Sequence, residues 1–165
     1  MSATDTSRSS RLADPVRPFV VGARGFVFLG IGHLALGAAL AALAAPTPQQ
    51  RAADAAMRES AFTLMGLERT TLDVFNGISI VMALFAVACG VLLLTAVRHA
   101  PTLVRRRTAF GRFALATSLA TLAVSIWLLP APPIVVLTIT SCAFALSLRR
   151  ATPQDDQHRP ARTAA

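Results

Sequence analysis

The chain has 165 residues, of which 54% are hydrophobic and only 15% are charged. This composition is too apolar for an ordinary soluble domain and indicates a membrane-embedded protein. The formal net charge is +8, and all sixteen basic residues are arginines that stand in short clusters between long uncharged runs. Because the interleaved aromatic and basic residues of a nucleic-acid groove are missing, no nucleic-acid partner is expected.

Four apolar runs are long enough to cross a bilayer, since about 20 helical residues span a hydrocarbon core of roughly 30 Å. The predicted spans are residues 20–45, 74–97, 110–129 and 132–148. The last two are separated by "PAPP" (Pro130 to Pro133), which ends one helix and starts the next. The sequence therefore predicts an all-α, integral membrane four-helix bundle, with flexible cytoplasmic tails at 1–19 and 149–165.

The first run also contains a small-residue pattern, Ala42-Leu43-Ala44, that is typical of a signal-peptide cleavage site. From Phe26 to Ala45 the run is almost entirely apolar. Signal cores usually have only about 7–15 apolar residues. We therefore favour a retained transmembrane helix.

The connection 46–73 is the only sizeable segment between spans. In "QQRAADAAMRESAFTLMGLER", Ala53, Met57, Ala61 and Leu64 fall on one helical face. This pattern predicts an extracytoplasmic amphipathic helix between the first two spans, lying on the membrane surface. Its expected role is to cap the bundle, with a lid over a partner or ligand site as the alternative.

Arginine predicts the orientation, because basic residues near helix ends are retained on the cytoplasmic side. All but three of the sixteen arginines flank the first span's start, the second connection or the last span's end. The exceptions, Arg51, Arg58 and Arg69, lie in the segment 46–73 beside four acidic residues. Both termini are therefore predicted to be cytoplasmic, with Trp127 near the outer interface.

Small and polar residues recur at helical spacing in the first two spans. One stripe consists of Gly30, His33, Gly37, Ala41 and Ala44, and the other of Asn76, Ser79, Ala83, Ala86 and Gly90. Helices in lipid associate through small residues that allow close approach and through a few hydrogen bonds. The two stripes are therefore expected to face each other.

His33 is the one ionisable residue deep inside a predicted span. We expect His33 to face away from lipid, because an unpartnered polar group in hydrocarbon costs several kcal/mol. Two interpretations stay open: an interhelical hydrogen bond, which we favour, or a proton or solute site. The candidate intramembrane polar residues are His33, Asn76, Ser79, Ser118, Thr121, Thr138 and Ser141.

Charged residues at the membrane edges form a second set of candidates: Arg24, Glu68, Arg69 and Asp73. Asp73 lies where a helix N-terminus favours a carboxylate, so capping is the expected role, with an outer mouth above His33 as the alternative. The cluster of Arg105, Arg106 and Arg107 is expected to attract anionic lipid.

Other chemistry lacks the residues it needs. His99 and His158 are outside the depth of His33, which disfavours bis-histidine haem. Cys89 and Cys142 form no C-x-x-C pair and are expected to be packing residues. No catalytic or metal-binding signature occurs, so no catalytic residue, metal or cofactor is predicted.

The segments "GIGHLALG" and "GLERTTLDVFNGISIVMALFAVACGVLLL" resemble small four-helix bacterial membrane proteins of unknown function, of the DoxX-like type. This resemblance covers the first two spans and the four-helix plan. It implies a bacterial inner-membrane location and a compact bundle, but no reaction and no catalytic residue.

Three functional hypotheses remain. The leading one is a non-enzymatic structural or partner-binding membrane protein that packs with itself or with another membrane protein. The alternatives are a small-solute or proton-linked permease that uses His33 and a membrane redox accessory protein.

Overall fold

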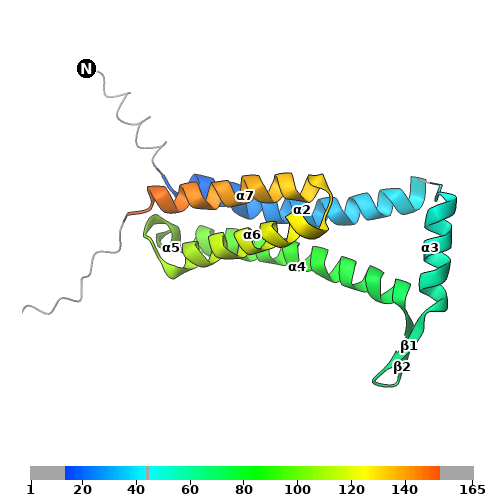
Figure 1. The fold of residues 1–165 in the computed structure, drawn as a ribbon. Coiled ribbons are helices and arrows are strands. Elements are labelled where there is room, and N and C mark those ends of the chain that lie inside the picture. Colours follow the sequence, from blue (N-terminus) through cyan, green and yellow to red (C-terminus); the bar gives the residue numbers. More distant parts are fainter. Residues whose placement is uncertain (1–13, 44, 153–165) are drawn as a thin grey trace, which may run out of the picture. The chain divides into compact units, whose positions relative to one another are not determined.

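The computed structural model describes residues 14–43 and 45–152. Four of its helices are long and apolar enough to cross a membrane, by length and composition. They are α2 (Val16–Leu43), α4 (Thr71–His99), α6 (Ala109–Leu128) and α7 (Ala131–Arg150) (Figure 1). This finding supports a multi-pass membrane protein and confirms the four predicted apolar helices. Most of both predicted tails (1–13 and 153–165), and Ala44 of the predicted stripe, lie outside the described residues.

The chain divides into two compact units, which we describe separately. The first unit is Met1–Gly25 together with Val91–Ala165, and the second unit is Phe26–Gly90. One boundary follows Gly25 in α2 and the other follows Gly90 in α4, so each of these helices contributes one end to each unit.

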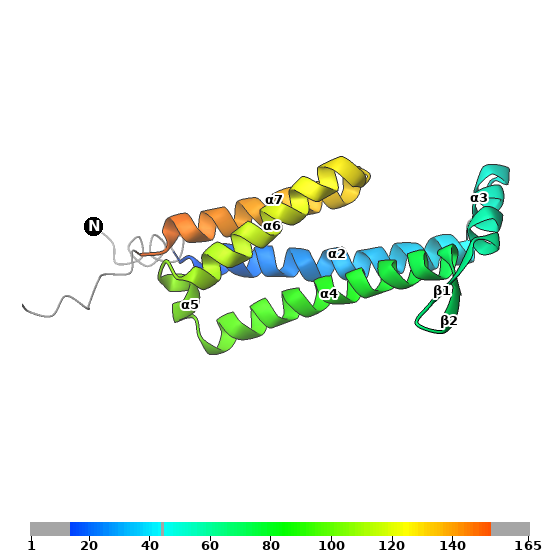
Figure 2. The same ribbon diagram turned by 60° about the horizontal axis from the view of Figure 1, so that its bottom comes forward.

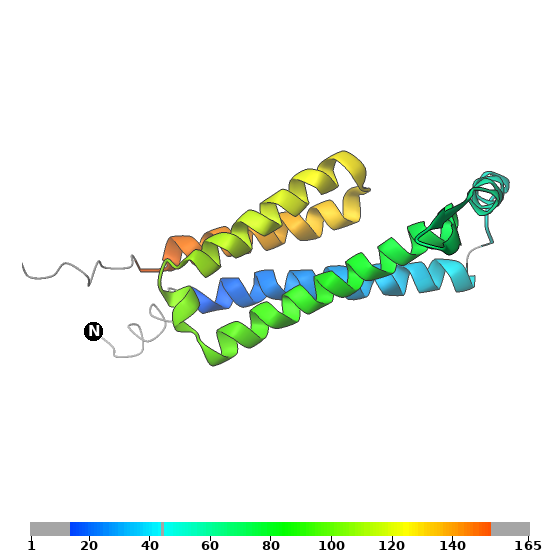
Figure 3. The same cartoon turned by 90° about the horizontal axis from the view of Figure 1, so that it is seen from below.

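In the first unit, α6 and α7 form an antiparallel hairpin and run side by side (Figure 3). Only Leu129 and Pro130 separate them, and prolines occupy the first turn of α7, where a missing backbone N–H costs no helical hydrogen bond. The prediction of a two-helix hairpin with its turn at the proline cluster is therefore confirmed. The short helix α5 (Thr102–Arg105) precedes α6.

Aromatic side chains hold the start of α2 in this unit. The ring of Phe19 lies 4.9 Å from that of Phe144 and 5.6 Å from that of Phe110, measured between centroids. Gly22 allows this approach, because a Cβ built there would be only 2.7 Å from Cε1 of Phe144. A Cβ on Gly25 would overlap the hydroxyl of Thr140. Two glycines thus allow α2 to pack directly against α7.

The helices at both ends of the membrane region extend beyond the predicted spans. Helix α2 begins at Val16, not at Val20, and Phe19 is only 1% exposed because it packs in the aromatic cluster. At the other end, α7 continues to Arg150 and Ala151 is buried. Apolar packing outside the strictly uncharged run therefore extends the folded region.

In the second unit, a helix and a two-stranded hairpin connect α2 to α4. Helix α3 (Pro48–Glu59) lies crosswise to α2 and α4 (Figures 1 and 2). It begins with a capping box, in which Gln50 N–H donates to Thr47 Oγ1 at 3.2 Å and Thr47 N–H donates to Gln50 Oε1 at 2.8 Å. No residue of α3 is buried.

The prediction of helix across the rest of this connection was wrong. Strands β1 (Ala61–Leu64) and β2 (Leu67–Thr70) pair antiparallel, with Ala61 opposite Thr70 (Figure 2). Met65 and Gly66 form the turn with positive φ values of 50° and 81°, the backbone conformation of a two-residue hairpin loop. Because Ala61 belongs to the strand, the predicted four-residue apolar face is not continuous, and the chain is not purely α-helical.

Candidate functional site

The predicted intramembrane polar residues are divided between the two units. His33, Asn76 and Ser79 belong to the second unit. The members from α6 and α7, which are Ser118, Thr121, Thr138 and Ser141, belong to the first unit. The two sets differ in their hydrogen-bond partners and in their exposure.

In the second unit, His33 on α2 forms a hydrogen bond to α4, with Nε2 at 2.7 Å from Ser79 Oγ. One turn earlier on α2, Gly30 is buried against the backbone oxygen of Ala83, and a Cβ at Gly30 would overlap that oxygen. The two predicted stripes therefore meet at these two levels. At the next level, Gly37 has no atom within 4 Å of a built Cβ, so the contact between the stripes ends there.

His33 remains exposed in spite of this bond. A neutral imidazole has one donor and one acceptor nitrogen. Within the described residues, Nε2 is the ring nitrogen that bonds, and Nδ1 has no hydrogen-bond partner there. Asn76, one turn nearer the start of α4, is also exposed. The second unit thus presents an incompletely partnered imidazole on the same helical face as Gly37.

In the first unit, polar side chains bond within the α6–α7 pair. Ser118 Oγ lies 2.9 Å from Ser141 Oγ, and both residues are buried. Thr121 donates to the carbonyl of Thr117 at 2.9 Å, and Thr138 to that of Ile134 at 2.8 Å. Thr121 and Thr138 therefore satisfy their hydroxyls on their own helices, as membrane helices commonly allow.

The structure also shows a polar contact that the sequence analysis missed. The hydroxyl of Ser147, on α7, donates to the backbone oxygen of Pro15 at 2.8 Å, and the serine is 2% exposed. This bond joins the end of α7 to the residue before α2. The distance of 132 residues along the chain left no local signal for it.

Of the membrane-edge candidates, Asp73 has a clear structural role. Thr70 N–H and Oγ1 donate to Asp73 Oδ2 at 3.2 and 2.8 Å, and Asp73 N–H donates to Thr70 Oγ1 at 3.1 Å. This reciprocal arrangement caps α4, which confirms the capping interpretation. Glu68 and Arg69 lie in β2, where Arg69 Nη1 donates to the carbonyl of Glu68 at 3.0 Å, and Arg24 is exposed on α2.

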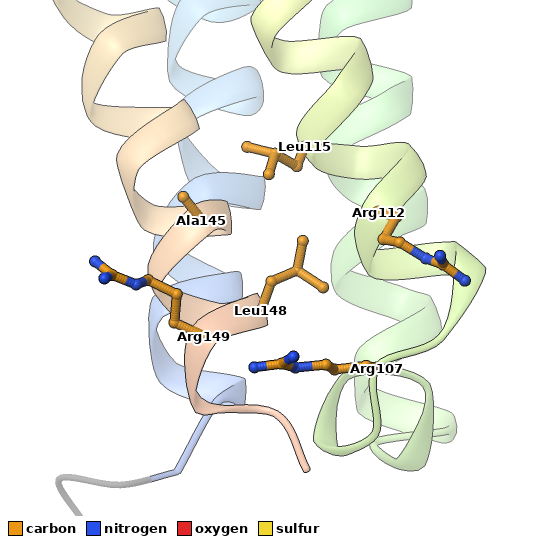
Figure 4. A pocket seen from close by; sticks show the side chains of 6 residues that line it. All are labelled: Arg107, Arg112, Leu115, Ala145, Leu148 and Arg149. Atoms are coloured by element: carbon orange, nitrogen blue, oxygen red, sulfur yellow. The ribbon is translucent and has the colours of Figure 1, made fainter. Parts of the chain in front are cut away.

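The three consecutive arginines of the predicted cluster have different surroundings in the structure. Arg105 Nε lies 4.0 Å from Asp14 Oδ1, and Arg106 is exposed in the connection between α5 and α6. Arg107 lines an open groove of about 510 Å³ at one end of the α6–α7 hairpin (Figure 4). The groove is lined by Arg107, Arg112, Leu115, Ala145, Leu148 and Arg149. Arg112 and Arg149 were not among the predicted site residues.

Among the described residues, no group of three or more His, Cys, Asp or Glu side chains is arranged to hold a metal ion. Cys89 is partly buried on α4, and Cys142 is exposed on α7. Every buried side-chain nitrogen and oxygen in the described ranges has a hydrogen-bond partner. The intramembrane hydrogen bonds found here therefore join or stabilise helices.

Comparisons with protein families, with characterised proteins and with solved structures find no match to this chain.

Proposed function

We propose that this chain is a non-enzymatic membrane protein that binds a transmembrane helix, from a second copy or from another membrane protein. The helix binds at the face of α2 that carries His33 and Gly37. In this proposal the four spans form a bundle in a bacterial inner membrane, both termini are cytoplasmic, and α3 lies on the outer surface. The distribution of arginines and the resemblance to DoxX-like proteins support the orientation and the location. The observation that carries the proposal is the exposed imidazole of His33.

The depth of His33 makes this exposure informative. His33 is nine residues beyond Arg24 on α2, which corresponds to about 14 Å of helix rise. With Arg24 at the inner interface, the imidazole lies near the middle of a hydrocarbon core of roughly 30 Å. A polar nitrogen at that depth requires a partner, because leaving it in lipid costs several kcal/mol.

Gly37 supplies the space for such a partner. It lies four residues after His33, and therefore on the same helical face, and nothing is within 4 Å of a Cβ built on it. Small residues at this kind of position allow two backbones to approach and form hydrogen bonds across the interface. A helix packed on Gly37 would cover the imidazole.

Disulfide crosslinking in native membranes tests this proposal. In a background with Cys89→Ala and Cys142→Ala, Gly37→Cys places a thiol on the proposed face. Ala39→Cys is the matched control, because it lies two residues further on the same exposed segment and on the opposite side of the helix. We expect a discrete crosslinked band from Gly37→Cys and none from Ala39→Cys, by oxidation for a second copy and by irradiation of a benzophenone attached to the thiol for a partner that has no cysteine.

The mass of the crosslinked band distinguishes a second copy, at twice the chain mass, from another membrane protein. The proposal is contradicted if neither variant crosslinks to another chain, or if both do so equally. The Gly37→Cys protein must also keep its helical circular dichroism, so that a missing band cannot be attributed to misfolding.

A proton-linked permease is the second candidate, because Nδ1 of His33 has no recorded hydrogen bond within the described part of the chain. The variant His33→Gln keeps a side chain that can bond Ser79 but cannot carry a proton between pH 5 and 8. If the permease hypothesis holds, vesicles containing the wild-type protein leak protons, as followed by an enclosed pH-sensitive dye, and the variant abolishes the leak. Equal proton flux in wild type, variant and empty vesicles would exclude a proton path through His33 that operates without a solute.

A further inference from the structure

The groove at the end of the α6–α7 hairpin combines charged and apolar side chains in a defined order (Figure 4). Arg112 lies in the first turn of α6 and Arg149 in the last turn of α7. Leu115 and Ala145 lie about one helical turn further along the same helices, away from this end. The groove therefore has a cationic mouth and an apolar inner wall.

Arg107 occupies the centre of the mouth. Its side chain extends from the α5–α6 connection toward α7 and passes beneath Leu148, whereas Arg112 and Arg149 extend outward on either side (Figure 4). The apolar wall is close-packed, because a Cβ on Gly111 would be 3.2 Å from Cδ2 of Leu148. The groove is thus formed by two closely packed helices and one loop.

Backbone hydrogen bonds hold the loop that carries Arg107. Arg107 N–H donates to the carbonyl of Thr152 at 2.9 Å, and Thr152 N–H donates to that of Arg105 at 3.0 Å. These bonds join the loop to the segment that follows α7, and Arg106 and Thr152 form a parallel β-bridge. The backbone position of Arg107 is therefore set before any ligand arrives, which reduces the entropy lost on binding.

The charge of the groove is uncompensated by its own lining. Three arginines line it, with the side chains of Arg112 and Arg149 extending outward on either side of Arg107, and none of the lining residues is acidic. Asp14, whose Oδ1 lies 4.0 Å from Arg105 Nε, does not line the groove. Guanidinium groups bind phosphate through paired N–H donors, so the mouth is complementary to a phosphate group with net negative charge.

The apolar wall specifies the rest of the ligand. A free phosphate would use only the arginines, whereas an amphiphile would also cover Leu115 and Leu148. The groove has a volume of about 510 Å³ and is open along one side, so a ligand bound there would keep part of its surface outside the groove. We infer that this groove binds an anionic phospholipid, with its headgroup phosphate on Arg107 between Arg112 and Arg149 and its acyl chains along Leu115 and Leu148.

This inference goes beyond the proposed helix-binding function, because it concerns the first unit and a different ligand. It also changes which arginines are expected to contact lipid. The sequence predicted lipid contact at three consecutive arginines, but Arg105 is engaged with Asp14 and Arg106 does not line the groove. The inferred headgroup site instead takes Arg107 from that cluster, flanked by one arginine from each helix of the hairpin.

Lipid retention by the full-length chain tests the inference. The protein is purified in a neutral detergent, titrated with phosphatidylglycerol or phosphatidylcholine, and examined by native mass spectrometry. We expect one phosphatidylglycerol to be retained in preference to phosphatidylcholine. Arg107→Gln should weaken this binding about tenfold or more, since it removes a charged hydrogen bond.

Arg106→Gln is the matched control. It makes the same charge change one residue away, outside the groove lining, and is expected to leave binding within about twofold of the wild type because exposed charges at greater distance are screened. Inorganic phosphate and glycerol phosphate, added as competitors, should displace the lipid about a hundredfold less effectively, because they cannot bury acyl methylenes.

Three results would each overturn the inference. Equal weakening by Arg107→Gln and Arg106→Gln would indicate diffuse attraction to net charge. Equal retention of phosphatidylcholine would show that the headgroup charge is not recognised. Competition by inorganic phosphate at lipid-like concentrations would assign the site to the free anion. Circular dichroism of each variant establishes that altered retention does not reflect unfolding.

Discussion

The α6–α7 hairpin of the first unit and the α2–α4 pair of the second unit are both apolar, but they bury their side chains to different degrees. In the hairpin, Ser118, Leu137 and Phe144 are at most 1% exposed. In the α2–α4 pair, Phe28 and Phe85 are 66% and 67% exposed, although Ala83 is 4% exposed at the glycine contact. One pair is therefore closely packed, and the other joins at a narrow contact, with large apolar side chains of its own left exposed.

Connection length accounts for part of this difference. Two residues join α6 to α7, so forming the turn already brings the two helices side by side. The connection from α2 to α4 contains α3 and the β1–β2 hairpin, and closing a longer loop costs more conformational entropy. Specific contacts at Gly30 and His33 must then define where α2 and α4 meet.

The largest expected effect is loss of the aromatic core in the first unit. Phe144→Ala removes a fully buried ring that packs on Phe19 and should lower the free energy of unfolding by about 3–5 kcal/mol. Phe113→Ala is the control, since Phe113 is 74% exposed on α6 and the change should cost less than about 1 kcal/mol. Unfolding by SDS titration, followed by circular dichroism, measures both values. Equal losses would mean that the hairpin is no better packed than its lipid-facing surface.

The second prediction tests the narrow contact of the second unit. Gly30→Ala should cost about 1–3 kcal/mol, because the new Cβ overlaps the backbone oxygen of Ala83 and forces the helices apart. Gly32→Ala meets no atom within 4 Å and should stabilise the helix by about 0.5–1 kcal/mol through its better propensity. The same SDS titration measures both. A neutral Gly30→Ala would show that α2 and α4 do not meet at this position.

The third prediction concerns the start of α4. Asp73→Ala removes the acceptor for the Thr70 amide and hydroxyl and should lower stability by about 1 kcal/mol. Glu68→Ala, in the exposed strand β2, removes the same charge and should change stability by less than about 0.5 kcal/mol. Hydrogen exchange at the first amides of α4 locates the effect. Faster exchange in both variants would indicate a general charge effect instead of capping.

The smallest expected effect is the hydrogen bond between His33 and Ser79. A double-mutant cycle with His33→Leu and Ser79→Ala should give a coupling energy of about 0.6 kcal/mol, the average for interhelical hydrogen bonds in membranes. Thr95→Ala serves as the control for Ser79→Ala, because it lies sixteen residues further along α4 and should show no coupling beyond about 0.3–0.5 kcal/mol. Equal coupling in the two cycles would remove the evidence for a specific bond.

Several local features could be predicted from particular residues. The proline cluster predicted the α6–α7 turn, and the stripes of small residues predicted the contact of Gly30 and His33 with α4. Asp73 was expected to cap a helix, and it does. In contrast, the turn at Met65 and Gly66 carries none of the Asn-Gly or Asp-Gly signals of a two-residue hairpin loop, and its flanking residues also fit a helical face.

Sequence alone determined that four helices are long and apolar enough to cross a membrane, because run length and charge content are local properties and bilayer thickness sets the threshold. Only the tertiary structure decided which polar groups meet. Ser147 bonds the carbonyl of Pro15, Arg105 lies near Asp14, and Arg107 joins Arg112 and Arg149 at one groove. These contacts depend on how helices distant in the chain pack, and periodicity within one helix carries no information about its neighbour.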